Sequence, residues 1–216
     1  LAIACILVSN SGVFGSAPSA YFLEQGLFLT GLISGLIFIL SALPMQAAGF
    51  LTDGARILQL LRGGPRAELD LLLIRTIALL KSGHRPSELD VQAMERGLQL
   101  GVRNIFSASL HQYLYLAYLD RREPSLAAFH LHRLMQSLDL FPPPYQGALY
   151  LEEAFYYAFY EHWPEKARHS FRNFKASPFV PDVERLKTEA ALAYVEGRME
   201  EAHRLARQTL QGLPDL

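Results

Sequence analysis

The chain has 216 residues, with 20 Lys and Arg, 21 Asp and Glu and a formal net charge of -1. Its basic residues are scattered and balanced by acids, which argues against a nucleic-acid partner, and the single cysteine, Cys5, excludes an intrachain disulfide framework and a cysteine-based zinc finger. No Lys or Arg precedes Arg56, and only Glu24 and Asp53 are acidic before it. We therefore expect a membrane segment over residues 1–55, followed by a soluble part of mixed charge.

The uncharged run 26–43 predicts a transmembrane helix. About 20 apolar residues span the hydrocarbon core as a helix, and Tyr21 and Phe22 stand where an aromatic belt is expected. The run 1–8 looks like the end of a preceding span, so we expect one to two transmembrane helices joined by a small-residue turn over 9–19. A buried core helix of a soluble protein is the alternative for 26–43.

Three further features concern this membrane segment. Gly31 and Gly35 have the small-xxx-small spacing that permits close helix packing, but glycine is common in membrane helices, and from the spacing alone we favour that simpler explanation. The chain opens without Met inside an apolar run, so we expect a fragment whose upstream part is missing, with a cleaved signal peptide as the alternative. Basic residues begin only after Asp53, so the positive-inside rule places the C-terminal part in the cytoplasm.

One carboxylate, Asp53, ends the apolar part of the chain. An acid there needs a partner such as a metal ion or a proton. Gly54 follows directly and allows the backbone to approach another group closely. Asp53 also suits the N-cap of a helix that starts near Gly54, so the residues leave two roles open, cap and ligand. A basic amphipathic segment, 56–62, comes next.

The pattern Ser41-x-x-Pro44 … Asp53-Gly54 resembles the third motif of the site-2 protease class of intramembrane zinc metalloproteases. In that family an Asn-x-x-Pro segment leads to an Asp-Gly in a core transmembrane helix. The longer frame Pro44 … Gly49-Phe50 … Asp53-Gly54-Ala55-Arg56 is similar to a bacterial subset of the family. Three departures are present: Ser41 replaces Asn, the distance from Pro44 to Asp53 is longer than usual, and no H-E-x-x-H occurs, since all seven histidines follow Asp53.

The resemblance implies the C-terminal part of a membrane-embedded zinc endopeptidase that hydrolyses peptide bonds of membrane or membrane-proximal substrates. Asp53 would be the third zinc ligand, with Ser41, Pro44 and Gly54 supporting the motif, while two His ligands and a Glu base would lie upstream. Catalytic zinc takes three protein ligands and lowers the pKa of water. The chain holds no catalytic residue of its own and should be inactive alone. The implied location is a bacterial cytoplasmic membrane.

Residues 56–104 are expected to form a helical connecting region. The run 69–80 predicts a helix with Asp70 and Arg75 exposed, which lies either on the membrane or inside the soluble domain. The segment 83–86 ends this helix, and another covers 90–100. His84 is expected on the surface.

Residues 105–216 predict a tetratricopeptide-like array of helical hairpins. Similar segments at 117–128, 158–167 and 193–202 are typical of stacked helix pairs, and Phe141 to Pro144 interrupts the array. Most aromatic residues there are expected to fill the core; the alternative is a concave surface that binds a peptide or a protein partner. His130 and His132 point to different helix faces and cannot share one metal ion, and His162 is expected in a loop.

The expected fold class is therefore all-α, with one to two transmembrane helices followed by a soluble tetratricopeptide-like helical-hairpin array. Two functions remain open. The chain is either part of a zinc endopeptidase, with the lipid bilayer and a peptide substrate as partners, or a non-catalytic membrane-anchored interaction scaffold in which Asp53 only caps a helix. A transporter or channel subunit fits less well, because a second intramembrane charge is missing from the sequence.

Overall fold

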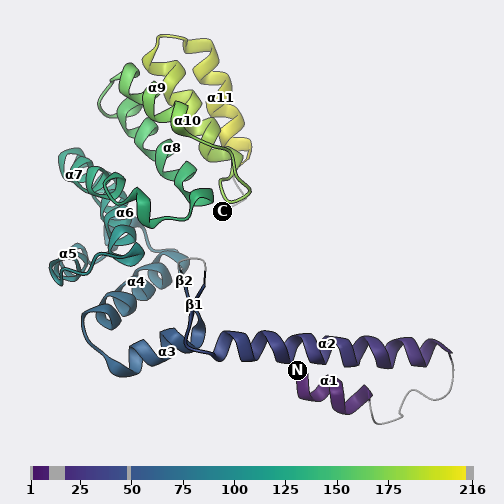
Figure 1. Ribbon diagram of the computed structural model, residues 1–216. Helices are drawn as coiled ribbons and strands as arrows, with labels where there is room; N and C mark the ends of the chain where they lie inside the picture. The colour runs from purple at the N-terminus through teal and green to yellow at the C-terminus, as the bar shows by residue number, and fades with distance from the viewer. Residues whose placement is uncertain (1, 10–17, 48–49, 213–216) are drawn as a thin grey trace. The chain divides into compact units, whose positions relative to one another are not determined.

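The structure, a computed structural model, describes residues 2–9, 18–47 and 50–212. Eleven α-helices occur in these ranges, with two strands of two residues each and two short 3-10 helices (Figure 1). The expected all-α class is confirmed. The chain divides into two compact units, residues 1–67 and residues 68–216.

The first unit contains α1 (Ala2–Ser9) and the long helix α2 (Pro18–Ala42). The stretch Tyr21–Ala42 is long and apolar enough to cross a membrane, and it includes all but one residue of the predicted span. The predicted turn over 9–19 lies largely outside the described residues. Its last two residues, Pro18 and Ser19, belong to α2, so the turn prediction is wrong at that end.

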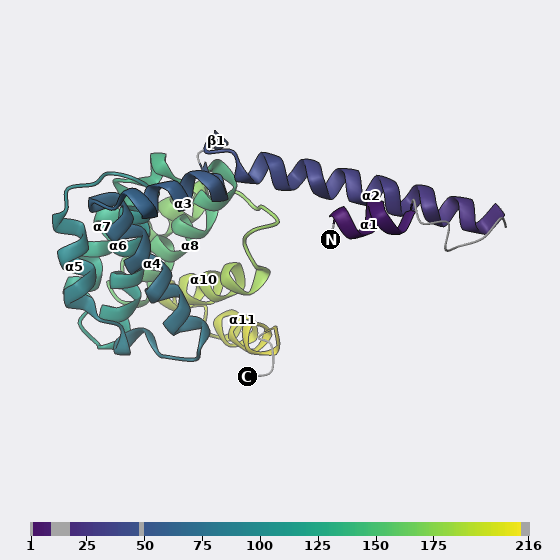
Figure 2. The same cartoon turned by 90° about the horizontal axis from the view of Figure 1, so that it is seen from below.

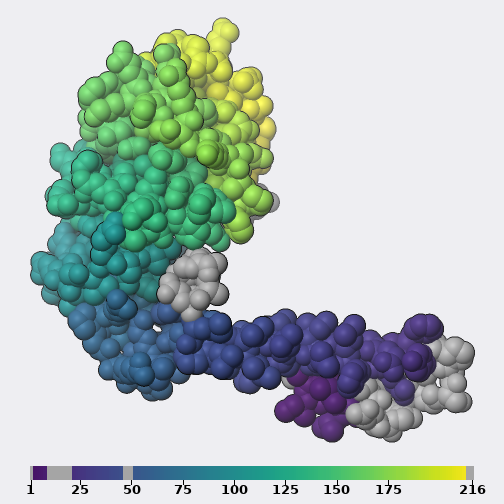
Figure 3. Space-filling model, in the orientation of Figure 1, coloured from purple at the N-terminus to yellow at the C-terminus, as the bar shows by residue number. Residues whose placement is uncertain are grey.

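Helix α1 lies beside α2 in both views (Figure 1, Figure 2), and the space-filling view shows their side chains in contact (Figure 3). A Cβ added to Gly31 would lie 2.8 Å from Ile6 Cγ1 and 2.9 Å from the Ala2 carbonyl oxygen. One added to Gly35 would lie 3.9 Å from Ala2 Cβ, so the two helices run antiparallel. The glycine at position 31 therefore has a packing role, which corrects the simpler explanation favoured from the spacing.

A short hairpin connects α2 to α3 (Asp53–Arg62). Strands β1 (Gln46–Ala47) and β2 (Phe50–Leu51) pair antiparallel, with Gln46 opposite Leu51 and Ala47 opposite Phe50. Helix α3 has apolar residues at 57, 58, 60 and 61, yet none of its residues is buried among the described parts of the chain.

The second unit begins within α4 (Pro65–Lys81), which is followed by η1 (Pro86–Glu88) and α5 (Val91–Gln99). Asp90 caps α5, because its Oδ1 accepts a hydrogen bond of 2.9 Å from the Ala93 amide. Asp70 is fully buried, so the prediction that it is exposed is wrong. It shares a helix face with the buried residues Leu73 and Thr76, spaced by three positions.

Three helical hairpins complete the second unit (Figure 1). They are α6 (Ile105–Asp120) with α7 (Pro124–Met135), α8 (Pro143–Phe159) with α9 (Pro164–Asn173), and α10 (Asp182–Val195) with α11 (Met199–Gln211). Proline opens α7, α8 and α9, where the missing amide costs no helical hydrogen bond. The 3-10 helix η2 (Leu138–Leu140) and Pro142 separate the first hairpin from the second, as the sequence predicts.

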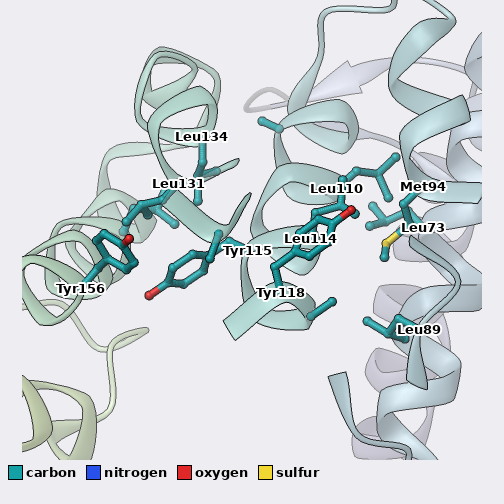
Figure 4. Packing of buried hydrophobic residues seen from close by; sticks show 14 of the residues in the cluster. Leu73, Leu89, Met94, Leu110, Leu114, Tyr115, Tyr118, Leu131, Leu134 and Tyr156 are labelled. Atoms are coloured by element: carbon teal, nitrogen blue, oxygen red, sulfur yellow. The ribbon is translucent and has the colours of Figure 1, made fainter. Parts of the chain in front are cut away.

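One core cluster of the second unit joins the region 68–104 to α6, α7 and α8 (Figure 4). Met94 of α5, Leu114 of α6 and Tyr156 of α8 are all buried in one cluster. Tyr115 and Tyr118 are buried as well, which agrees with the expected core-filling role of many aromatic residues. The predicted helix over 69–80 is thus partly a core helix: Leu69 is fully buried.

Candidate functional site

A groove in the first unit brings together the four residues that the sequence motif selects. Ser41 and Pro44 come from the end of α2 and the segment after it, and Asp53 and Gly54 come from the start of α3. The groove has a volume of about 490 Å³, and its remaining wall is apolar, formed by Phe38, Ala42, Ile57, Leu58 and Leu61. The structure therefore gathers a motif whose parts lie on separate elements.

Thr52 is the N-cap of α3. Its Oγ1 accepts a hydrogen bond of 3.4 Å from the Ala55 amide and one of 3.1 Å from the Met45 amide. The hydroxyl proton points to the carbonyl oxygens of Leu43, 2.5 Å away, and Met45, 3.1 Å away. The expected alternative that Asp53 caps this helix is therefore wrong, because Thr52 takes the capping position and Asp53 is the first helical residue.

The Asp53 side chain is exposed at the start of α3 and makes no hydrogen bond or ion pair with any described residue. A carboxylate in the first helical turn is favoured by the positive end of the helix dipole. Since Thr52 satisfies the helix end, both oxygens of Asp53 remain available as acceptors. This availability is the chemical property that a metal ligand requires.

Gly54 explains how the two helices meet. A Cβ at this position would lie 1.8 Å from the carbonyl oxygen of Ala42 and 2.5 Å from its carbonyl carbon. No side chain larger than hydrogen fits without moving the backbone. The expected close approach of the backbone at Gly54 is thus present, and its partner is the C-terminal end of α2.

The fit of this groove to zinc depends on how many metal-binding side chains the described residues bring together. They contain no group of three His, Cys, Asp or Glu that could hold a metal ion. Asp53 has the right chemistry for one zinc ligand, an exposed carboxylate without a competing partner in the described chain, but catalytic zinc takes three protein ligands. Any zinc held here would depend on further donors from outside the described residues.

The second unit contains a pair of histidines that the sequence did not predict. His111 of α6 and His130 of α7 face each other with 2.9 Å between their Nδ1 atoms, so one ring donates a hydrogen bond and the other accepts it. The Tyr118 ring stacks on His130 at 5.4 Å between centroids. Burial is the main cause that lowers the pKa of each histidine to about 4, and for His111 the neighbouring His130 and Arg133 contribute to the same shift.

Three other histidines, His84, His132 and His162, agree with the predictions made for them from the sequence. His132 is exposed while His130 is buried, as expected for residues two positions apart on a helix. His84 is exposed, and His162 lies in the turn between α8 and α9 with φ of 50°. The pair of His111 and His130 could have been inferred only from the predicted helical hairpin, because the antiparallel packing of α6 on α7 brings these two positions together.

The second unit has two adjoining cavities over α7, α8 and α9, with volumes of about 560 and 210 Å³. Both are lined by Glu153, Tyr157, Trp163 and Lys166. The Lys166 ammonium lies 4.1 Å from the ring centroid of Trp163 and 4.9 Å from that of Tyr157, a cation–π arrangement. We call this surface the α7–α9 groove.

Comparison with known proteins returned no relative. No protein-family model matches the chain, and neither a curated protein nor a solved structure does.

Proposed function

We propose that the chain supplies one zinc ligand, Asp53, to a membrane-embedded zinc endopeptidase of the site-2 protease type. The observation that carries the proposal is the groove in which Ser41, Pro44, Asp53 and Gly54 come together. Two details support it. Thr52 caps α3 in place of Asp53, and the close contact of Gly54 with Ala42 holds the carboxylate-bearing turn against the end of α2.

The residues present determine which roles this chain would have in the proposed zinc site and which roles would belong to residues outside it. Zinc, when bound, would polarise the scissile carbonyl and lower the pKa of water. Asp53 would hold the metal through its carboxylate, and the apolar wall of Phe38, Ile57 and Leu61 would limit water around it. The other two ligands and the general base would come from an H-E-x-x-H helix outside this sequence, so the chain alone should not cleave peptides.

The proposed location is a bacterial cytoplasmic membrane, with residues 68–216 in the cytoplasm. The helix α2 provides a stretch of sufficient length and apolarity to span the bilayer. The absence of Lys and Arg before Arg56 supports the orientation, because basic residues collect on the cytoplasmic side. The substrates proposed are peptide bonds of membrane or membrane-proximal proteins.

The test is the zinc content and peptidase activity of the full-length protein, purified in detergent, with and without Asp53→Ala. We expect about one zinc per chain in the unchanged protein, and a loss of both zinc and cleavage in the variant. Asp139→Ala is the matched control, because Asp139 is also an exposed carboxylate and forms an ion pair with the exposed Arg103. Zinc and cleavage that persist in Asp53→Ala would rule the proposal out.

A second candidate is a membrane-anchored interaction scaffold without catalysis. The α7–α9 groove favours it, because Tyr157 and Trp163 line it and tyrosine and tryptophan are enriched at protein-binding surfaces. The sequence of the gene upstream of Leu1 separates the two candidates. An H-E-x-x-H in a membrane helix supports the peptidase, and a span without a histidine pair supports the scaffold.

A further inference from the structure

Helix α3 carries an apolar stripe that nothing in the described chain covers. Ile57 is 59% exposed and Leu61 is 80% exposed, and both lie on one face of the helix, four positions apart. Leu58 borders this face and lines the same groove. We call Ile57, Leu58 and Leu61 the α3 stripe. Removing three large apolar side chains from contact with water is favourable, so a lipid or protein surface is expected to cover them.

The α3 stripe continues the apolar surface of α2. Phe38, one turn before the end of α2, is 72% exposed and lines the groove together with all three residues of the stripe. The hydrogen bonds of Thr52 and the contact of Gly54 with Ala42 fix the start of α3 at the end of α2. Whatever covers the end of α2 is therefore next to the α3 stripe, and the end of a membrane span is covered by lipid.

Basic residues border the stripe at its far end. Arg62, the last residue of α3, follows Leu58 by four positions, and Arg66 lies at the start of α4, after the turn at Gly63 and Gly64. Both are exposed, and neither makes an ion pair with a described residue. Long basic side chains can lie along an apolar surface and keep their charges at the headgroups. Anionic lipids attract such residues just after a transmembrane helix.

We propose that α3 lies in the interface of an anionic bilayer, with the α3 stripe among the acyl chains and Arg62 and Arg66 at the lipid phosphates. An amphipathic helix with apolar residues on one side, an arginine at its end and a second arginine just after it has the composition of an interfacial helix. The proposal depends on α2 crossing the bilayer but not on zinc or peptidase activity, so it stands or falls separately from the proposed function.

Site-directed spin labelling of the full 216-residue chain tests the proposal. Cys5→Ser removes the single cysteine, and a nitroxide is then attached after Ile57→Cys, Leu61→Cys or Gln59→Cys in separate proteins. Gln59 is the matched control, because position 59 faces away from positions 57 and 61 on a helix. Each protein is reconstituted in vesicles of phosphatidylcholine alone or with phosphatidylglycerol, and its helix content is checked by circular dichroism.

The measured quantities are the accessibilities of each label to oxygen, which concentrates in lipid, and to neutral NiEDDA, which stays in water. In phosphatidylglycerol vesicles we expect labels at 57 and 61 to have a several-fold higher ratio of oxygen to NiEDDA accessibility than the label at 59. Adding Arg62→Glu and Arg66→Glu should lower that ratio, as should removal of the anionic lipid.

Three results would overturn the proposal. High NiEDDA accessibility at 57 and 61 would mean that water covers the stripe, and low accessibility to both reagents would mean that protein covers it. Equal ratios with and without phosphatidylglycerol would exclude the contribution of anionic headgroups.

Discussion

At the scale of single residues, the junction between α2 and α3 depends on two small side chains. The Thr52 hydroxyl connects the helix start to the backbone of residues 43 and 45, and Gly54 leaves room for the Ala42 carbonyl. Neither residue has the chemistry of a metal ligand in this setting. Their effect is to hold the exposed Asp53 next to Ser41 and Pro44, so the site is sensitive to changes that leave its acidic residue untouched.

Gly54→Ala should weaken this junction. The added Cβ would lie far inside the contact distance of the Ala42 carbonyl oxygen, so the backbone must move, at a cost of about 1–3 kcal/mol or more. The free energy of unfolding in detergent measures this cost. Gly26→Ala is the matched control, because no atom of the described residues lies within 4 Å of that added Cβ; it should be neutral or stabilising by up to about 1 kcal/mol.

Thr52→Ala should destabilise the start of α3 by about 1 kcal/mol, the usual cost of losing an N-cap. Thr52→Ser keeps the hydroxyl and should retain most of the stability. The comparison uses thermal unfolding of the two variants in the same detergent. Equal losses in both variants would show that the methyl group, and not the hydrogen bonds of Oγ1, holds the junction.

At the scale of elements, the hairpin of α6 and α7 buries two titratable side chains against each other. The hydrogen bond between His111 and His130 needs at least one ring without a proton on Nδ1. Glu95 favours the charged form of His130, but burial outweighs it and the pKa falls to about 4. Both rings are therefore neutral at pH 7, and the hairpin is adapted to neutral histidines.

The stability of this hairpin should decrease as the pH falls. The ordinary histidine pKa is 6.5, and each folded value is about 4, so the unfolded chain binds more protons between these values. The contribution of the pair to the free energy of unfolding is fully present above about pH 6.5 and is lost progressively as the pH falls to about 4. Chemical unfolding from pH 8 to 4, followed by tryptophan fluorescence, measures this.

The double variant His111→Leu with His130→Phe removes both titrating groups from the hairpin and should flatten the dependence between pH 6.5 and 4. His84→Ala, which removes an exposed histidine, is the control and should leave the dependence unchanged. An equally steep pH dependence in the double variant would assign the effect to other groups.

Local sequence signals predicted elements better than they predicted contacts. Prolines at 124 and 164 mark the starts of α7 and α9, and the apolar run 26–43 marks α2. The sequence suggested Asp53 as a cap, but the adjacent Thr52, which is also of a type that caps helices, takes this position. The buried Asp70 and the pair of histidines depend on packing between helices, which local periodicity does not contain.

At the scale of the whole molecule, one core cluster of the second unit extends across the expected boundary at residue 105. Met94 on α5 is 1% exposed and belongs to the same cluster as Tyr115 and Tyr156. Arg121 strengthens the connection, because its guanidinium donates hydrogen bonds of 2.9 Å to the carbonyls of Ser87 and Leu89. The region 68–104 thus folds with the repeats instead of linking them as a separate connector.

Met94→Ala should destabilise the complete second unit. Removal of a buried methionine side chain costs about 2–5 kcal/mol, and the loss should be visible at Trp163, the single tryptophan, which lies between α8 and α9. Urea unfolding monitored by fluorescence gives the midpoint. Met199→Ala is the matched control, since Met199 is 49% exposed, and should change stability by less than about 0.5 kcal/mol. An unchanged midpoint for Met94→Ala would mean that α5 unfolds independently.

The contact of α1 with Gly31 gives the chain an intrinsic chemical probe. Cys5 holds the only thiol in the sequence, and it is partly buried where a Cβ on Gly31 would lie 3.3 Å from its own Cβ. The rate at which a maleimide alkylates this thiol therefore reports how often α1 separates from α2. A larger residue at position 31 should speed the labelling, which makes helix association measurable in intact membranes without purification.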